Sequence, residues 1–88
     1  MTQSTGLAVT VRYFAAARAA AGVDSETVTV PAGTGVAELA ETLAGRHERL
    51  GTVLLRCAYL RDGVAVRDHA AALSAGETVD VLPPFAGG

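Results

Sequence analysis

The chain has 88 residues, half of them hydrophobic and 18% charged, which suits one globular domain with a single modest core. A net charge of −2 gives no basis for binding nucleic acid or an anionic membrane surface. No apolar run has the length of a signal peptide or a membrane span, and a single cysteine cannot form an internal disulfide. We therefore expect a cytoplasmic protein with no nucleic-acid partner and no membrane partner.

Alternating side chains predict two strands in the first third of the chain. Hydrophobic residues alternate from Leu7 to Phe14 and again from Glu26 to Val30. An alanine-rich run between them, residues 15–21, predicts a short helix that Gly22 ends. The first strand has little polar character on either side, so we expect it near the centre of a sheet.

The main helix is predicted to begin after Thr34, because threonine is a good N-cap residue. Glutamates lie early in this segment and arginines late, as the helix dipole favours. A further helical turn is expected over residues 50–55. Hydrophobic residues recur at helical spacing in the main helix, at Val36, Leu39, Ala40 and Leu43.

Three more strands are predicted in the second half, over residues 56–61, 64–67 and 78–82. Asp62-Gly63 lies between the first two strands and predicts a type I′ hairpin turn. Residues 68–74 should form a turn held by Leu73.

This order of elements predicts an α+β domain of the β-grasp, or ubiquitin-like, type. Its mixed sheet would have about five strands, with one main helix packed across it and the first and last strands paired centrally. We expect the domain to occupy residues 7–84, between a flexible N-terminal tail, residues 1–6, and an extended C-terminal tail, residues 85–88.

Residues that commonly act in catalysis or metal binding are few. Cys57 lies in a predicted strand, which favours a small buried side chain over a nucleophile. His47 and His69 have no cysteine or carboxylate at metal-ligand spacing, so we expect solvated histidines and no metal site. Asp62 is explained by the turn. The chain on its own is therefore predicted to bind no cofactor and to catalyse no reaction.

The C-terminal end combines conformationally rigid prolines with glycines that have no side chain. After the last predicted strand come Pro83, Pro84, Phe85, Ala86, Gly87 and Gly88. Proline fixes φ and removes a ladder donor, so the strand should end sharply, and glycine lets another backbone approach closely. Such a tail can enter a narrow channel and offer its terminal carboxylate. All seven cationic side chains are arginines, so no lysine amine of this chain would compete for an activated carboxylate.

A carboxylate reacts only after activation, for example as an acyl-adenylate formed with ATP by a partner enzyme. Capture by a sulfur nucleophile would make the chain a sulfur carrier, and capture by an amine would make it a protein modifier. A third hypothesis is an interaction module in which the tail has no role.

Several motifs together resemble MoaD, the small sulfur-carrier subunit of molybdopterin synthase. They are V-T-V-R-Y-F-A-A-A-R-A-A-A-G at 9–22, T-G-V-A-E-L-A-E-x-L from Thr34, L-x-x-G-E-x-V at 73–79 and the ending L-P-P-F-A-G-G. The resemblance covers residues 8–88. Family members often carry valine and a small polar residue where this chain has Phe85-Ala86. The thiamine-pathway relative ThiS shares the fold and the Gly-Gly ending but usually lacks the Pro-Pro step, which favours MoaD.

The resemblance implies that a MoeB-like enzyme adenylates Gly88 with ATP and that a sulfurtransferase supplies the sulfur of a thiocarboxylate. The tail would then enter the active site of a MoaE-type large subunit, in a heterotetramer. There it would donate sulfur to cyclic pyranopterin monophosphate during molybdenum cofactor biosynthesis. Gly87 would provide clearance, and Pro83 and Pro84 direction. The candidate partner-binding residues are Leu82, Phe85, Arg18 and Phe14. A solvated helix face is the alternative interpretation of Arg18, and a carrier for thiamine or cysteine synthesis is the alternative pathway.

Overall fold

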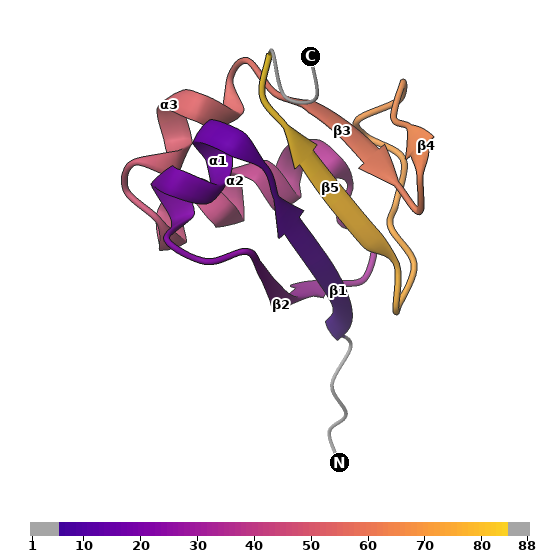
Figure 1. Ribbon diagram of the computed structural model, residues 1–88. Coiled ribbons are helices and arrows are strands. Elements are labelled where there is room, and N and C mark those ends of the chain that lie inside the picture. The colour runs from indigo at the N-terminus through magenta and orange to yellow at the C-terminus, as the bar shows by residue number, and fades with distance from the viewer. Residues whose placement is uncertain (1–5, 85–88) are drawn as a thin grey trace.

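The computed structural model describes residues 6–84, which form one mixed sheet with helices packed on one side (Figure 1). The sheet has five strands in the order β2-β1-β5-β3-β4. The elements are β1 (Gly6–Tyr13), α1 (Ala15–Ala21), β2 (Ser25–Pro31), α2 (Val36–Arg46), α3 (Leu50–Leu54), β3 (Ala58–Arg61), β4 (Val64–Ala65) and β5 (Thr78–Leu82).

The predicted β-grasp architecture is confirmed. β1 and β5 are central neighbours and run parallel, whereas β1 with β2, β3 with β4 and β3 with β5 are antiparallel. The main helix α2 packs across the sheet as expected, and β1 begins at Gly6, one residue earlier than predicted. No helix within residues 6–84 is long and apolar enough to cross a membrane.

The hydrophobic core lies between the sheet and the helices. Alternate residues of β1 and β5 point into it, because successive side chains of a strand face opposite sides. Val36, Leu39 and Leu43 supply the buried stripe of α2, as their spacing predicted, while Ala40 is half-buried. The strand residues of the core are Val9, Val11, Tyr13, Val28, Val30, Tyr59, Val79 and Val81.

The first helix forms where the alanine run predicted it. Gly22 ends α1 in the left-handed conformation, with φ of 80°, and its N–H donates to the carbonyl of Arg18 at 2.8 Å. Ala15 begins the helix with φ of 52°, which is unusual for a residue with a Cβ. The chain therefore turns abruptly from β1 into α1.

The predicted N-cap of the main helix was wrong by one residue. Gly35 occupies the cap position, and its N–H donates to the Glu38 carboxylate at 3.3 Å. The hydroxyl of Thr34 instead donates to the carbonyl of Pro31 at 2.6 Å. A Cβ on Gly35 would lie 2.6 Å from the carbonyl oxygen of His69, so this close approach of the 69–72 segment selects glycine.

The strands after α3 are shorter than predicted. Arg56 and Cys57 continue the turn that follows α3, so β3 begins at Ala58, and β4 comprises only Val64–Ala65. The Asp62-Gly63 turn is confirmed, because both residues have positive φ, 49° and 85°, as a type I′ turn requires. The Asp62 carboxylate also accepts the N–H of Thr78 at 2.8 Å, which ties this hairpin to β5.

Replacing Gly35 tests the contact between the 69–72 segment and the start of α2. We expect Gly35→Ala to lower the free energy of unfolding by about 1–3 kcal/mol, because the added methyl group must displace backbone atoms. Gly45→Ala is the matched control within α2, since a Cβ there meets no atom within 4 Å. It should be neutral or stabilise by up to about 1 kcal/mol. Equal effects of the two substitutions on urea unfolding would contradict this interpretation.

Candidate functional site

The C-terminal segment leaves the sheet at the end of β5, between the two neighbouring strands. Leu82 forms the last pair with Ala58 of β3, and Pro83, which follows it, is buried. On the other side the N–H of Phe14 donates to the carbonyl of Val81 at 3.3 Å. The root of the tail thus lies at the end of a central strand, next to the start of α1 and the start of β3 (Figure 1). The predicted tail residues Phe85, Ala86, Gly87 and Gly88 lie outside the described residues.

A mostly apolar groove of about 370 Å³ borders this root on the side of the helices. Arg56 is the charged residue among those that line it. The lining residues are Ala16, Thr52, Val53, Arg56, Pro83 and Pro84. The two prolines thus form one wall of the groove, and α1 and α3 contribute the others.

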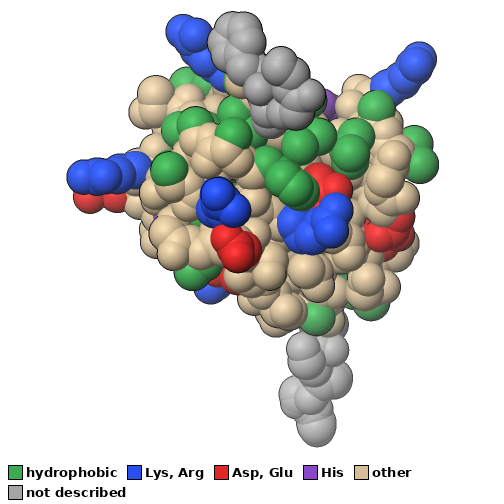
Figure 2. Space-filling model, viewed as in Figure 1, with side chains coloured by type: hydrophobic (Ala, Val, Ile, Leu, Met, Phe, Trp, Pro, Cys, Tyr) green, Lys and Arg blue, Asp and Glu red, His purple; other side chains and the backbone are tan. Residues whose placement is uncertain are grey.

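The sheet face opposite the helices is not covered by any element of residues 6–84 (Figure 1). We call this surface, comprising Arg12, Phe14, Leu60, Asp80 and Leu82, the open face. The strand registers place these residues on one side, because Arg12 pairs with Asp80, Asp80 with Leu60, and Phe14 and Leu82 follow two residues later. Figure 2 is viewed from the side of β1 and β5 and shows hydrophobic side chains gathered beside neighbouring cationic and anionic groups. The predicted partner-binding residues Leu82 and Phe14 therefore share one surface.

A bidentate ion pair lies at the centre of the open face. Nε and Nη2 of Arg12 donate to Oδ1 and Oδ2 of Asp80 at 2.6 and 2.8 Å. The Asp80 side chain is only 8% exposed, whereas that of Arg12 is 53% exposed and its guanidinium lies 5.5 Å from the centroid of the Phe14 ring. The hydrogen bonds from Arg12 to Asp80, and the negative charge of Asp80, raise the pKa of Arg12. Sequence reasoning missed this pair, because β1 and β5 are far apart in the chain.

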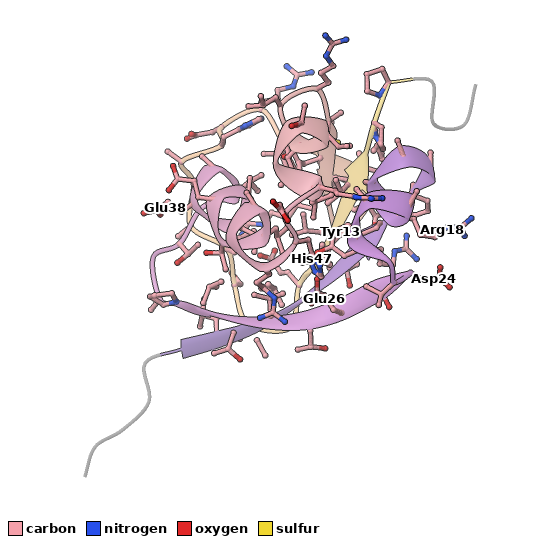
Figure 3. All side chains as sticks on the ribbon, turned by 90° about the vertical axis from the view of Figure 1, so that its left-hand side faces the viewer. Tyr13, Arg18, Asp24, Glu26, Glu38 and His47 are labelled. Carbon is pink, nitrogen blue, oxygen red and sulfur yellow. The ribbon has the colours of Figure 1, made fainter. Side chains whose placement is uncertain are left out.

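Arg18 lies on the exposed side of α1, where its guanidinium is 3.5 Å from the Asp24 carboxylate (Figure 3). Both side chains are largely exposed, so the pair contributes little to stability. A contact between Arg18 and a partner remains a prediction.

The expectation that His47 is solvated was wrong. Its Nε2 lies 2.6 Å from Oε2 of Glu26, and the hydroxyl of Tyr13 donates to the same oxygen at 2.6 Å. Arg46 donates to the other carboxylate oxygen at 2.9 Å. The rings of Tyr13 and His47 meet edge to face, with centroids 6.0 Å apart. Figure 3 shows Tyr13, Glu26 and His47 converging where β1, β2 and the end of α2 meet.

This polar cluster is a structural tie between α2 and the sheet. Burial by itself raises the pKa of Glu26, but hydrogen bonds from Tyr13 and His47 and the charges of His47 and Arg46 outweigh it and lower the pKa. Burial first, and then the hydrogen bond to Glu26, raise the pKa of Tyr13 well above its ordinary value. Glu26 is therefore ionised at neutral pH, and both of its oxygens are already bonded.

The remaining candidates for chemistry are structural as well. Cys57 is half-buried against the core, as predicted for a small side chain, although it follows α3 and does not lie in a strand. Its Sγ donates to the carbonyl of Val53 at 3.3 Å, and burial raises the pKa of the thiol, so the reactive thiolate is disfavoured. His69 is exposed, with its ring edge-on to Tyr59. Residues 6–84 contain no group of three or more His, Cys, Asp or Glu side chains that could hold a metal ion.

Comparison with known proteins identifies the family. Residues 11–88, nearly the whole chain, match the ThiS family. The chain belongs to this family. A molybdopterin synthase sulfur carrier subunit from Chlamydomonas reinhardtii is 31% identical over 81 residues, covering 91% of this chain and 98% of that protein. The resemblance to MoaD that the motifs predicted is thereby confirmed.

Two similar solved structures show the same fold. The putative molybdopterin converting factor subunit 1 of Pyrococcus furiosus is 31% identical, with a TM-score of 0.82 over 90% of this chain and 99% of that chain. SAMP1 of Haloferax volcanii, a small archaeal modifier protein, is 26% identical, with a TM-score of 0.79 over 92% of this chain and 99% of that chain. The fold therefore fits both a sulfur carrier and a protein modifier.

The free energy of unfolding, measured as a function of acidic pH, tests the role of the Glu26 cluster. A carboxyl group with a lowered folded-state pKa stabilises the fold above its unfolded-state pKa, about 4.3, and loses that contribution as the pH falls through the folded-state value. We expect Glu26→Gln to cost about 1.5–3 kcal/mol at pH 7, because a charge-assisted hydrogen-bond acceptor is lost. The cost should shrink as the pH falls below the ordinary glutamate value.

Urea unfolding at pH 7 and at a series of acidic pH values would measure this difference. Glu41→Gln, at an exposed position of α2, is the control and should keep the wild-type profile. A constant difference between Glu26→Gln and the wild type at every pH would contradict the prediction.

Proposed function

We propose that this chain is the sulfur-carrying small subunit of a molybdopterin synthase and that Gly88 carries the sulfur as a C-terminal thiocarboxylate. The observation that carries the proposal is the position of the tail root. β5 ends at the centre of the sheet, beside the open face, and the ThiS family match continues from there to Gly88. The names of the relatives from C. reinhardtii and P. furiosus support the molybdopterin pathway.

The chemistry requires activation of the Gly88 carboxylate. In the proposed sequence a MoeB-like enzyme joins a carboxylate oxygen to the α-phosphorus of ATP and releases pyrophosphate. A persulfide of the sulfurtransferase then attacks the acyl carbon and AMP leaves. A thiol reduces the acyl disulfide that results, which cleaves its S–S bond and leaves the thiocarboxylate. The sulfur finally passes to cyclic pyranopterin monophosphate in the active site of a MoaE-type large subunit. The carrier supplies no catalytic group to these steps, and ATP is bound by the activating enzyme.

The role of this chain is to present its C-terminal end to the partner enzymes. Pro83 is buried, and Leu82 before it pairs with Ala58 of β3, so the point at which the tail leaves the sheet is fixed. The open face provides an apolar surface beside this point. We assign Leu82 and Phe14 to the contact with the large subunit because both lie next to the root. Phe85 would extend that contact, and Gly87 would give the backbone clearance in a narrow channel. A dithiolene contains two sulfur atoms, so a heterotetramer with two carriers suits the reaction.

A ubiquitin-like modifier is the second candidate function, favoured by the likeness to SAMP1. The activation step is the same, but an amine of another protein captures the acyl group. This function predicts a ladder of higher-mass conjugates in cells that depends on Gly88. A sulfur carrier for thiamine or cysteine synthesis would share the thiocarboxylate but would not support a MoaE-type subunit.

Reconstitution tests the proposed function. The thiocarboxylated chain, mixed with the large subunit from the same organism and cyclic pyranopterin monophosphate, is expected to yield molybdopterin. A variant lacking Gly87 and Gly88 should give none and should keep the wild-type melting temperature, because chain termini contribute little stability. Removal of Thr2 and Gln3 from the other terminus is the control and should preserve the yield. Molybdopterin formation by the variant without Gly87 and Gly88 would refute the proposal.

A further inference from the structure

We propose that the Arg12–Asp80 ion pair is a specificity element of the open face. The ion pair would restrict binding to a large subunit whose docking surface is mostly apolar but carries one hydrogen-bond acceptor. That acceptor would lie opposite Arg12. This inference rests on the proposed function, because that function supplies the partner. It goes further by stating the chemistry that the partner surface must have.

The pair lies where a partner that holds the tail must bind. Asp80 precedes Leu82 by two residues on the same side of β5, a separation of about 7 Å along a strand. Arg12 is paired across from Asp80, and Leu60 flanks Asp80 on the other side. A surface that covers Leu82 and Phe14 at the tail root therefore also covers the ion pair.

Arg12 has hydrogen-bond donors that its pairing with Asp80 does not use. A guanidinium carries five N–H groups in a fixed plane, and Arg12 uses Nε and Nη2 for its two bonds to Asp80. Its guanidinium makes no other hydrogen bond to residues 6–84, and its side chain is 53% exposed. The remaining N–H groups thus have no acceptor among residues 6–84 and belong to a side chain that is about half exposed. An apolar partner surface would remove the water bound to these N–H groups and offer no acceptor in its place. Binding would then carry the full desolvation cost of the donors.

The pair cannot readily rearrange to suit a different partner. Asp80 is held in the central strand with its side chain 8% exposed, so movement of Arg12 would leave a buried carboxylate without its counter-charge. The ring of Phe14, 5.5 Å from the guanidinium, gives a second contact that fixes Arg12. The orientation of the free donors is therefore set before binding. A partner either presents an acceptor at that position or is rejected, which is how buried polar groups produce selectivity.

A second ion pair of the sheet, between the end of β3 and the residue before β5, provides a matched control. Nε of Arg61 donates to Glu77 at 2.7 Å, just before β5 begins and therefore at the end opposite the tail root. Arg61 is paired with Val79, whose side chain lies in the core, so this ion pair belongs to the other side of the sheet. A partner on the open face would not touch it.

Binding of the purified large subunit from the same organism, measured by calorimetry, tests the proposal. The double variant Arg12→Leu/Asp80→Val replaces the ion pair by apolar side chains and leaves no charge unpaired. We expect its melting temperature to equal or exceed that of the wild type, because apolar replacement of a paired, largely buried charge is often neutral or stabilising. Its Kd for the large subunit should rise at least tenfold. The control Arg61→Leu/Glu77→Gln should keep the wild-type Kd.

A wild-type or tighter Kd for the double variant would overturn the inference, because the open face would then need only an apolar partner. If the double variant does not fold, Arg12→Lys serves in its place, since it keeps the charge but loses the planar set of donors. Weakened binding of a folded Arg12→Lys chain supports the inference, and unchanged binding overturns it. No binding by the wild-type chain, with melting intact, would instead refute the proposed function.

Discussion

The structure depends on the parallel pairing of β1 with β5. This pairing joins the first strand of the domain to the last, in a register that runs from Thr10 opposite Thr78 to Tyr13 opposite Val81. It brings the valines of both strands into one core beneath the helices. It also brings Arg12 beside Asp80 on the opposite side, and it fixes the place where the chain leaves the sheet. Core, open face and tail root therefore follow from one long-range contact.

The described residues suit a protein that presents a reactive terminus and leaves catalysis to its partners. The Glu26 carboxylate is occupied by the groups that tie α2 to the sheet, and the Cys57 thiol is held protonated by burial. What remains available is a surface, namely an apolar face with a fixed ion pair and a groove beside a rigid Pro83-Pro84 step. Such a surface orients a tail, and a partner enzyme can then carry out the chemistry.

Local patterns predicted the elements well. The late start of β3 has a local cause, the turn that continues after α3, whereas long-range contacts account for the errors at Thr34 and His47. Alternation located the strands, and the Asp-Gly turn was specified by its own backbone requirements. Gly35 replaced Thr34 as N-cap because a distant segment packs against the start of α2, which no local pattern reports. Glu26 could have been found, since it shares its side of β2 with the inward-facing valines. Its partners Tyr13 and His47 come from β1 and the end of α2, and only the folded structure brings them together. The Arg12–Asp80 pair was missed for the same reason, because its register between distant strands cannot be read from either strand alone.

The most direct test is the intact mass of the protein purified from its native host, with fragmentation of the C-terminal peptide. If the chain is a sulfur carrier, a fraction of it will show one oxygen replaced by sulfur, and fragmentation will place that change at Gly88. A carboxylate that stays unmodified after incubation with ATP, a sulfur donor and the adenylating enzyme would contradict the central claim.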